Sequence, residues 1–199
     1  MIIMNKQNTK IVLDTSIFVN PDSRKFFGKS PREALVGFIK IIKTKNNLSC
    51  YIPPSVYQEL IKFTKELPAD KDILIKKKSP ASYQDSIPAL LFYEFIDETR
   101  ARINKGLRIT EKYTRQGLKK EDNREAAQEL IQSARQEYRI ALREGILDSK
   151  EDFDLILVAK ELEAYLATSD KGLIKWAQKL GIICLSAEEL KSLIFNPRS

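Results

Sequence analysis

The chain has 199 residues, 43% of them hydrophobic, which is enough to bury a core as one or two domains. It contains no histidine, which excludes ribonucleases that use a histidine pair, Ser-His-Asp hydrolases and Cys-His hydrolases. The net charge of +7 favours a polyanionic partner, nucleic acid first and an anionic membrane surface second.

Membrane insertion and export are not expected. No apolar run approaches the ~20 residues of a membrane span, and the first ten residues, MIIMNKQNTK, lack the apolar region of a signal peptide. Cys50 and Cys184 have no zinc-like spacing and are expected to be reduced core residues. We therefore expect a cytoplasmic protein with no membrane partner.

The first predicted strand covers residues 10–13, where the apolar run IVL is typical of a strand buried on both faces of a parallel sheet. The strand leads directly into Asp14. Burying an unpaired charge is expensive, so this carboxylate needs water, backbone donors or a cation. A local alternative is that Asp14 only hydrogen-bonds within its own turn, at Thr15 and Ser16.

Two helices and a second strand follow. The stretch SPREALVGFIKIIKTK predicts a helix that begins with a Ser30/Glu33 capping box, LSCYIP predicts a short strand, and PPSVYQELIKFTKEL predicts a helix with Ser55 and Gln58 in capping-box register. The stretch ADKDILIKKKSPASYQDS is expected to form an exposed loop. Its basic run, Lys76–Lys78, is expected to be solvated, with an RNA contact as the alternative.

Residues 87–144 carry no strand signal and are expected to form a protruding basic helical hairpin, inserted between the two parts of an α/β domain, 1–86 and 145–199. On the second helix an apolar stripe follows the helical period: Leu130, Ala134, Tyr138, Ala141 and Leu142. Basic residues recur on another face of that helix and before it: Arg135, Arg139, Arg143, Arg115, Lys119 and Lys120. This basic surface either binds RNA or is the solvated face of an amphipathic helix pair.

The last part of the chain returns to strand–helix alternation. The stretch DSKEDFDLILVAKELEA predicts a buried helix, YLAT a strand, KGLIKWAQKLG a helix and IICLS the last strand. The final helix is expected to begin with a Ser186/Glu189 capping box. Strands that alternate with helices predict an α/β fold with a central parallel sheet.

Acidic residues gather where sites form in such folds, beyond the carboxyl ends of the strands. Six acids lie at the ends of two predicted strands or in the first turns of two predicted helices: Asp14, Asp170, Glu59, Asp148, Asp152 and Asp154. Within the predicted helix DSKEDFDLILVAKELEA, Asp148 and Asp152 are four residues apart and are expected to share one face. Asp154 is expected to point to the opposite side.

Several of these acids have a purely structural alternative. Asp148 fits a capping box with Glu151, and Asp170 is placed to cap the helix that follows it. Glu59 has the spacing of a surface residue on its helix. Taken together, these structural explanations account for the acids less well than a shared site does, because acids at strand ends recur in both halves of the chain.

Clustered carboxylates repel one another: two charges ~4 Å apart cost about 1–4 kcal/mol at effective dielectric constants of 80 to 20. Several together therefore need protons or cations. Oxygen ligands without His or Cys select a hard divalent ion, Mg²⁺ or Mn²⁺, and such an ion can supply a water that attacks a phosphorus atom. Acids, metal and a basic arm together predict a phosphodiesterase that acts on nucleic acid.

Three stretches resemble the successive acidic motifs of PIN-domain nucleases: VLDTSIF, PPSVYQEL and DFDLILVAKELEAYLATSD. The spacing to Asp170 suits that pattern better from Asp152 than from Asp154. A core of this size, interrupted by a basic helical hairpin before REGILDSKEDFD, is similar to the RNA-free ribonuclease P proteins called HARPs. The resemblance covers essentially the full chain.

This resemblance implies a PIN-like three-layer fold and an enzyme, without an RNA subunit, that removes 5′ leaders from precursor tRNA by metal-dependent hydrolysis and leaves a 5′ phosphate. It implies four acids that are catalytic and hold the metal: Asp14, Asp148, Asp152 and Asp170. It implies four residues in support: Asp154, Glu59, Thr15 and Ser16. The hairpin would grip the tRNA elbow, and the chain would form a homo-oligomer in which dimers assemble into larger complexes.

Other functions remain open at this stage. One is a toxin-like PIN endonuclease that cuts mRNA or tRNA loops, although compact toxins lack a dedicated arm. Another is a non-catalytic RNA-binding partner of an RNA-repair ligase, which leaves the acids at the strand ends without a role. A receiver-like phosphoacceptor or a DxD-type phosphatase is disfavoured, because the DTS stretch has no second Asp two residues on.

Overall fold

The computed structural model describes residues 8–45, 47–65, 74–81, 88–118, 124–143 and 149–195. The chain divides into two compact units. One, here called the sheet unit, contains residues 1–84 and 149–199, and the other, the hairpin unit, contains residues 85–148. Lys119, Lys120 and Asp148 lie outside the described residues, as do the side chains of Leu142 and Arg143.

Five parallel strands form the centre of the sheet unit, in the order β3-β2-β1-β4-β5. Their bounds are β1 Thr9–Leu13, β2 Leu48–Ile52, β3 Ile75–Lys77, β4 Tyr165–Ala167 and β5 Cys184–Leu185. The apolar run in β1 is completely buried, as expected for the middle strand of a covered parallel sheet. The strand order reverses between β1 and β4, which makes their carboxyl ends the switch point of the sheet.

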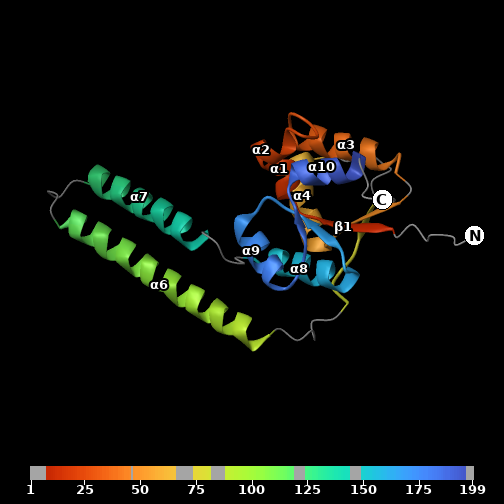
Figure 1. Cartoon of the computed structure of the whole chain (residues 1–199). Coiled ribbons are helices and arrows are strands. Elements are labelled where there is room, and N and C mark those ends of the chain that lie inside the picture. The colour runs from red at the N-terminus through yellow and green to blue at the C-terminus, as the bar shows by residue number, and fades with distance from the viewer. Residues whose placement is uncertain are drawn as a thin grey trace, which may run out of the picture. The chain divides into compact units, whose positions relative to one another are not determined.

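Helices cover both faces of this sheet, so the unit has three layers. The helices of the sheet unit are α1 Ser16–Val19, α2 Pro21–Arg24, α3 Pro31–Ile42, α4 Pro54–Thr64, α8 Lys150–Leu162, α9 Lys171–Lys179 and α10 Ala187–Phe195. Figure 1 shows α3 and α10 on one side of β1, and α8 and α9 on the other. Within the core, Phe38 packs edge-to-face against Phe18 and Phe27.

The capping box predicted at Ser186 and Glu189 is confirmed, since the two residues exchange hydrogen bonds at the start of α10. Ser30 caps α3 as predicted by accepting from the N–H of Glu33, but the Glu33 carboxylate accepts from the N–H of Lys29 instead of Ser30. The box predicted at Ser55 is wrong, because Pro53 is the N-cap of α4 and makes no side-chain cap. The hydroxyl of Ser55 donates instead to Asp154, on α8.

The Lys76–Lys78 run was predicted to lie in an exposed loop, but its first two residues belong to β3, which pairs with β2 at the edge of the sheet. The side chains of Lys76 and Lys77 are exposed, and Lys77 lies over the ring of Tyr57 at 4.1 Å. Charged side chains are common on edge strands, where they discourage pairing with other chains. They also hide the strand from sequence analysis, because the apolar signal is reduced to Ile75.

Two helices make up the described part of the hairpin unit, α6 Ala89–Gly117 and α7 Arg124–Arg143. They pack against each other, with Ile109 and Ala141 buried and Gly106 against the ring of Tyr138. Glu137 ties the helices together, accepting from Lys112 at 2.7 Å and from the hydroxyl of Tyr113 at 3.0 Å.

No helix in the described ranges is both long and apolar enough to cross a membrane.

We expect Gly37→Ala to destabilise the fold. A Cβ at this position of α3 would lie 2.2 Å from the carbonyl oxygen of Phe27, a backbone atom that cannot turn away. Overpacking of this kind costs about 1–3 kcal/mol, to be measured as a lower free energy of unfolding in urea. Gly117→Ala is the matched control, since its Cβ would meet nothing within 4 Å. Equal stability of the two variants would contradict the packing of α3.

Candidate active site

Asp14 lies at the switch point of the sheet. It directly follows β1, and its N–H donates to the carbonyl of Ala167, the last residue of β4, at 3.0 Å. Only 6% of the residue is exposed. The carboxylate therefore sits where the ends of two neighbouring strands meet, in the position that ligand sites of open α/β sheets occupy.

Two hydroxyl groups from opposite halves of the chain hold this carboxylate. Ser16 donates to Oδ2 of Asp14, and Thr168 donates to the same oxygen at 2.6 Å. Each hydroxyl also accepts from a backbone N–H, Ser16 from Ser169 at 2.9 Å and Thr168 from Asp170 at 3.0 Å. Because each hydroxyl has a single proton, both are committed to Asp14, and the orientation of the carboxylate is fixed.

The second oxygen of Asp14 is held less firmly. The Thr15 hydroxyl donates to Oδ1 at 3.3 Å, and the N–H of Ser16 also donates to the carboxylate. The predicted hydrogen bonds of Asp14 within its own turn are therefore present, since Thr15 and Ser16 both donate to it. The bond from Thr168 shows that the anchoring extends to the other half of the chain.

Negative charge accumulates around this position. Burial raises the pKa of Asp14, hydrogen bonds from Ser16 and Thr168 act against that rise, and the charge of Asp170 adds to it. Burial also raises the pKa of Glu59, and the charges of Asp14 and Glu151 raise it further. Glu59, on α4, and Glu151, on α8, therefore lie within electrostatic reach of the site.

Asp170 combines a structural role with its place in the site. It is the N-cap of α9, where Oδ1 accepts from the N–H of Leu173 at 2.9 Å. The capping alternative is confirmed, and Asp170 still acts electrostatically on Asp14. The cap uses one carboxylate oxygen, so it does not exclude a further ligand at the other.

The start of α8 differs from the expected arrangement. Ser149 is its N-cap, in an extended conformation with φ −138° and ψ 158°, and accepts from the N–H of Asp152 at 3.0 Å. A capping box of Asp148 with Glu151 is therefore wrong. Helical spacing does not extend through Ser149 either, so it no longer pairs Asp148 with Asp152, and the part of Asp148 in the site stays a prediction.

Asp152 and Asp154 lie half-buried in the first turns of α8. The hydroxyl of Ser55 donates to Oδ2 of Asp154 at 2.8 Å and so joins the first turn of α4 to α8. This bond explains why Ser55 does not cap α4, and it assigns Asp154 to holding two helices together. Asp152 is still the acid of α8 whose distance along the chain to Asp170 suits the pattern of acidic motifs described above, and its part in the site stays a prediction.

Three residues that lie at or near this site were not predicted from the sequence to take part in it. Thr168 is one, and its signal was available, since a hydroxyl residue at the end of YLAT lies level with Asp14 once β1 and β4 are paired. Glu151 is another, signalled only by the density of acids in DSKEDFD. The third is Ser169, whose buried Oγ has no hydrogen-bond partner among the described residues.

In the hairpin unit, the described basic residues of the predicted RNA surface are exposed: Arg115, Arg135 and Arg139. Arg135 and Arg139 flank a hollow of about 320 Å³ between α6 and α7, beside the ring of Tyr138. The predicted apolar stripe of α7 faces α6 through Tyr138 and the buried Ala141. The two arginines therefore lie next to the helix interface and remain accessible.

The donor set suits a hard divalent cation, because all the described acids at this site offer oxygen only. No three acids or cysteines of the described ranges lie close enough together to hold a metal ion by themselves. Mg²⁺ needs no such cage, since it is commonly bound through one or two carboxylates, waters and substrate phosphates. The buried charge of Asp14 and the raised pKa of Glu59 are the features that a cation would relieve.

Comparison with known proteins identifies the family. Residues 10–196 match the model described as PINc domain ribonuclease. The chain belongs to this family. The match confirms the α/β fold class expected from the sequence. PIN nuclease domains generally use divalent metal ions.

Relatives of this PIN-domain chain match it over nearly their whole length. A protein of Thermodesulfovibrio yellowstonii named RNA-free ribonuclease P is 48% identical over 198 residues, which cover 98% of each chain. Proteins of the same name from Pyrococcus furiosus and Haloarcula marismortui are 42% and 38% identical, covering 93% of this chain in both cases and 92% and 89% of their own. The similarity therefore includes the hairpin unit as well as the PIN-domain core.

We expect Asp14→Asn to stabilise the metal-free protein at neutral pH. Because the folded pKa of Asp14 is raised, the folded state favours the protonated acid, so the wild type loses stability as the pH rises through that pKa. The substituted protein does not. Its Tm should be higher, by roughly 2–4 °C for each kcal/mol gained, and the difference should shrink as the pH is lowered.

Thermal unfolding in the presence of a chelator, at several pH values, measures this difference. Asp22→Asn is the control, because its side chain is 94% exposed. A Tm difference for Asp14→Asn that does not change with pH would contradict the cost assigned to the buried charge.

Proposed function

We propose that this PIN-domain chain is an RNA-free ribonuclease P, an endoribonuclease that removes the 5′ leader from precursor tRNA. In this reaction water attacks the phosphorus atom at the junction of leader and tRNA. The bond from phosphorus to the 3′ oxygen of the leader breaks, so the mature tRNA keeps the 5′ phosphate. No RNA subunit is required.

The observation that carries this proposal is the extent of the match to the relatives. Proteins named RNA-free ribonuclease P align with the inserted hairpin unit as well as with the core. A compact toxin-like PIN endonuclease has no use for such a unit. A non-catalytic RNA-binding protein has no use for Asp14, because a buried charge costs stability and a catalytic role is what accounts for it.

Four acids are proposed to hold Mg²⁺ or Mn²⁺: Asp14, Asp148, Asp152 and Asp170. When bound, such an ion supplies Lewis acidity for phosphodiester hydrolysis. Ser16 and Thr168 orient Asp14, Thr15 donates to it, and Glu59 places a further carboxylate within electrostatic reach. Asp154 holds α8 against α4 by accepting a hydrogen bond from the hydroxyl of Ser55.

The hairpin unit is proposed to bind the tRNA elbow through basic side chains: Arg115, Arg135, Arg139, Arg143, Lys119 and Lys120. The exposure of the described arginines supports this assignment. A homo-oligomer, with dimers assembling into larger complexes, is also proposed. It is supported by large apolar side chains that α6 exposes, among them Phe92, Tyr93, Ile103 and Leu107. The expected cytoplasmic location stays a prediction.

Precursor tRNA incubated with the protein and Mg²⁺ should be cut at the mature 5′ end. We expect Asp14→Ala and Asp152→Ala to reduce cleavage to background while the Kd for tRNA stays within about twofold of wild type, because affinity comes mainly from phosphate contacts elsewhere. Asp22→Ala is the control, because the side chain of Asp22 is 94% exposed. No cut at the mature 5′ end by folded wild-type oligomer would refute the function, and equal loss of binding and cleavage would make the acids structural.

Arg135→Ala combined with Arg139→Ala should weaken tRNA binding and flatten its dependence on salt. Each phosphate contact that is lost reduces the log–log slope by roughly 0.7–0.9, so a reduction of about 1–2 is expected. Arg32→Ala combined with Lys40→Ala removes the same charge from exposed positions of α3 and is the control. An unchanged slope in the arginine variant would move the RNA-binding surface elsewhere.

A further inference from the structure

Helix α8 is attached to the described chain on both sides of the hairpin unit. The chain that leaves β3 is held at Ala81 by Glu161, in the last turn of α8. The chain that returns from the hairpin unit begins again at Ser149, the N-cap of the same helix. The first turns of α8 also carry the acids Asp152 and Asp154. One helix therefore links the insertion to the candidate active site.

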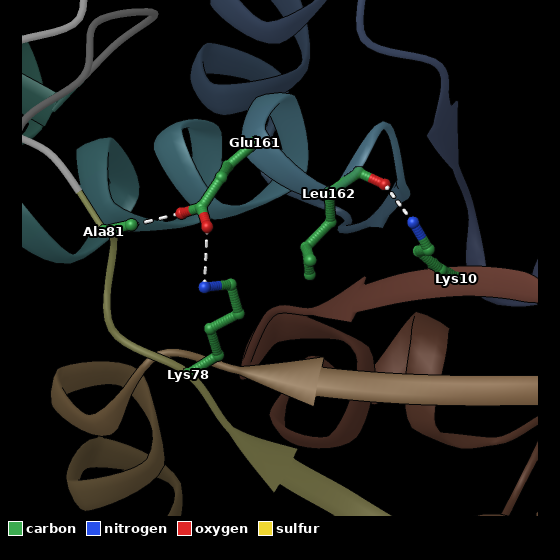
Figure 2. A network of polar contacts seen from close by, with 5 residues as sticks. All are labelled: Lys10, Lys78, Ala81, Glu161 and Leu162. Carbon is green, nitrogen blue, oxygen red and sulfur yellow. Dashed lines mark hydrogen bonds and ion pairs between the residues drawn. The ribbon is translucent and has the colours of Figure 1, made fainter.

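The attachment before the insertion is a clamp made by one carboxylate. Figure 2 shows Glu161 between two residues of the segment Lys78–Ala81, which we call the connecting segment. Oε1 lies 2.7 Å from the ammonium of Lys78, and Oε2 accepts from the N–H of Ala81 at 2.9 Å. These two contacts lower the pKa of Glu161, because both favour its charged form.

The connecting segment is also held from the sheet side. The N–H of Lys78 donates to the carbonyl of Ile52 at 3.0 Å, which continues the pairing of β3 with β2 by one residue. Pro80 is buried. The segment is thus fixed at several successive points immediately before residues 82–87, which lead to α6.

The helix that carries the clamp is itself fixed to the central strand. The ammonium of Lys10, on β1, donates to the carbonyl of Leu162 at 3.1 Å (Figure 2). A cation at the carboxyl end of a helix also opposes the negative end of the helix dipole. The connecting segment is therefore clamped to an element that is anchored to β1, the strand that leads into Asp14.

The clamp is poorly suited to a role in overall stability. The side chains of Lys78 and Glu161 are 26% and 31% exposed, and partly exposed ion pairs contribute little to the free energy of unfolding. The role of the clamp is better inferred from where it lies in the chain than from its contribution to stability. It restrains the backbone at the point where an RNA-binding insertion leaves the domain that carries the acids.

We propose that Glu161 is a positioning residue for RNA cleavage. By holding the connecting segment against α8, it limits the directions in which the chain can leave the sheet unit, and so restricts which phosphodiester of an RNA bound to the hairpin unit reaches Asp14. This proposal rests on the proposed function for its consequence, but the restraint itself is independent of catalysis.

The restraint is tested by measuring distances between spin labels on the two units. Labels are placed at the exposed positions Glu188→Cys and Leu118→Cys, in a Cys184→Ser background, with labelled protein diluted into unlabelled protein so that only distances within one chain are counted. Glu161→Ala should broaden the distance distribution. Glu161→Gln should broaden it less, because its amide oxygen can still accept from Ala81.

Asp22→Asn, which removes a charge from an exposed side chain, should leave the distribution unchanged. Equal widths for wild type and Glu161→Ala would overturn the proposal. The measurement needs neither RNA nor activity, so it decides on the clamp even if wild-type protein does not cut precursor tRNA and the proposed function fails.

The consequence is tested by mapping the 5′ ends of cleaved precursor tRNA. Glu161→Ala should increase the fraction of cuts that are displaced by one or more nucleotides and lower the single-turnover rate several-fold, with the Kd for tRNA unchanged. Lys78→Arg, which retains the ion pair, should keep the wild-type cleavage pattern. Unchanged cleavage accuracy in Glu161→Ala would overturn the positioning role, whatever its effect on the distances.

Discussion

The whole site depends on a carboxylate that is buried at the end of a strand. Asp14 is 6% exposed, and an ionised group in such a place is unfavourable unless hydrogen bonds or a cation compensate it. The hydroxyls that compensate it, Ser16 and Thr168, are 152 residues apart in the chain. They meet only because β1 and β4 are neighbours. The pairing of these two strands is therefore a requirement of the site as much as of the sheet.

Helix N-termini are expected at the same edge of the sheet. In parallel strand–helix units each helix begins near the carboxyl edge of the sheet, and its first turn carries a partial positive charge. Asp170 caps α9, and Asp152 lies in the first turn of α8 behind the cap at Ser149. Residues that cap helices for structural reasons thus place acids where the strands end. Capping and catalysis are compatible roles here, because a cap occupies one oxygen or a backbone group and leaves the rest of the carboxylate available.

Much of the fold was predictable because its signals are local. Apolar runs indicated β1, β2, β4 and β5, and N-cap residues marked the starts of α3 and α10. What failed depended on non-local context. Strand β3 is defined by pairing with β2 and carries lysines because it is an edge. Asp148 and Ser149 are both good caps, and local sequence did not decide between them. Thr168 acquires its role only when β4 lies beside β1.

The distribution of charge explains why binding and cleavage are assigned to different units. Carboxylates that gather around Asp14 repel the phosphates of any RNA, so the acids themselves oppose binding and do not supply its free energy. That free energy must come from basic residues elsewhere, and Arg135 and Arg139 are exposed on a helix that carries none of the site acids. If RNA is bound by one unit and cut by the other, the accuracy of the cut depends on how reproducibly the chain between the two units presents the RNA to the acids. In our proposal helix α8 provides this accuracy, since it carries Asp152 near its start and Glu161 near its end, and Lys10 fixes it to β1.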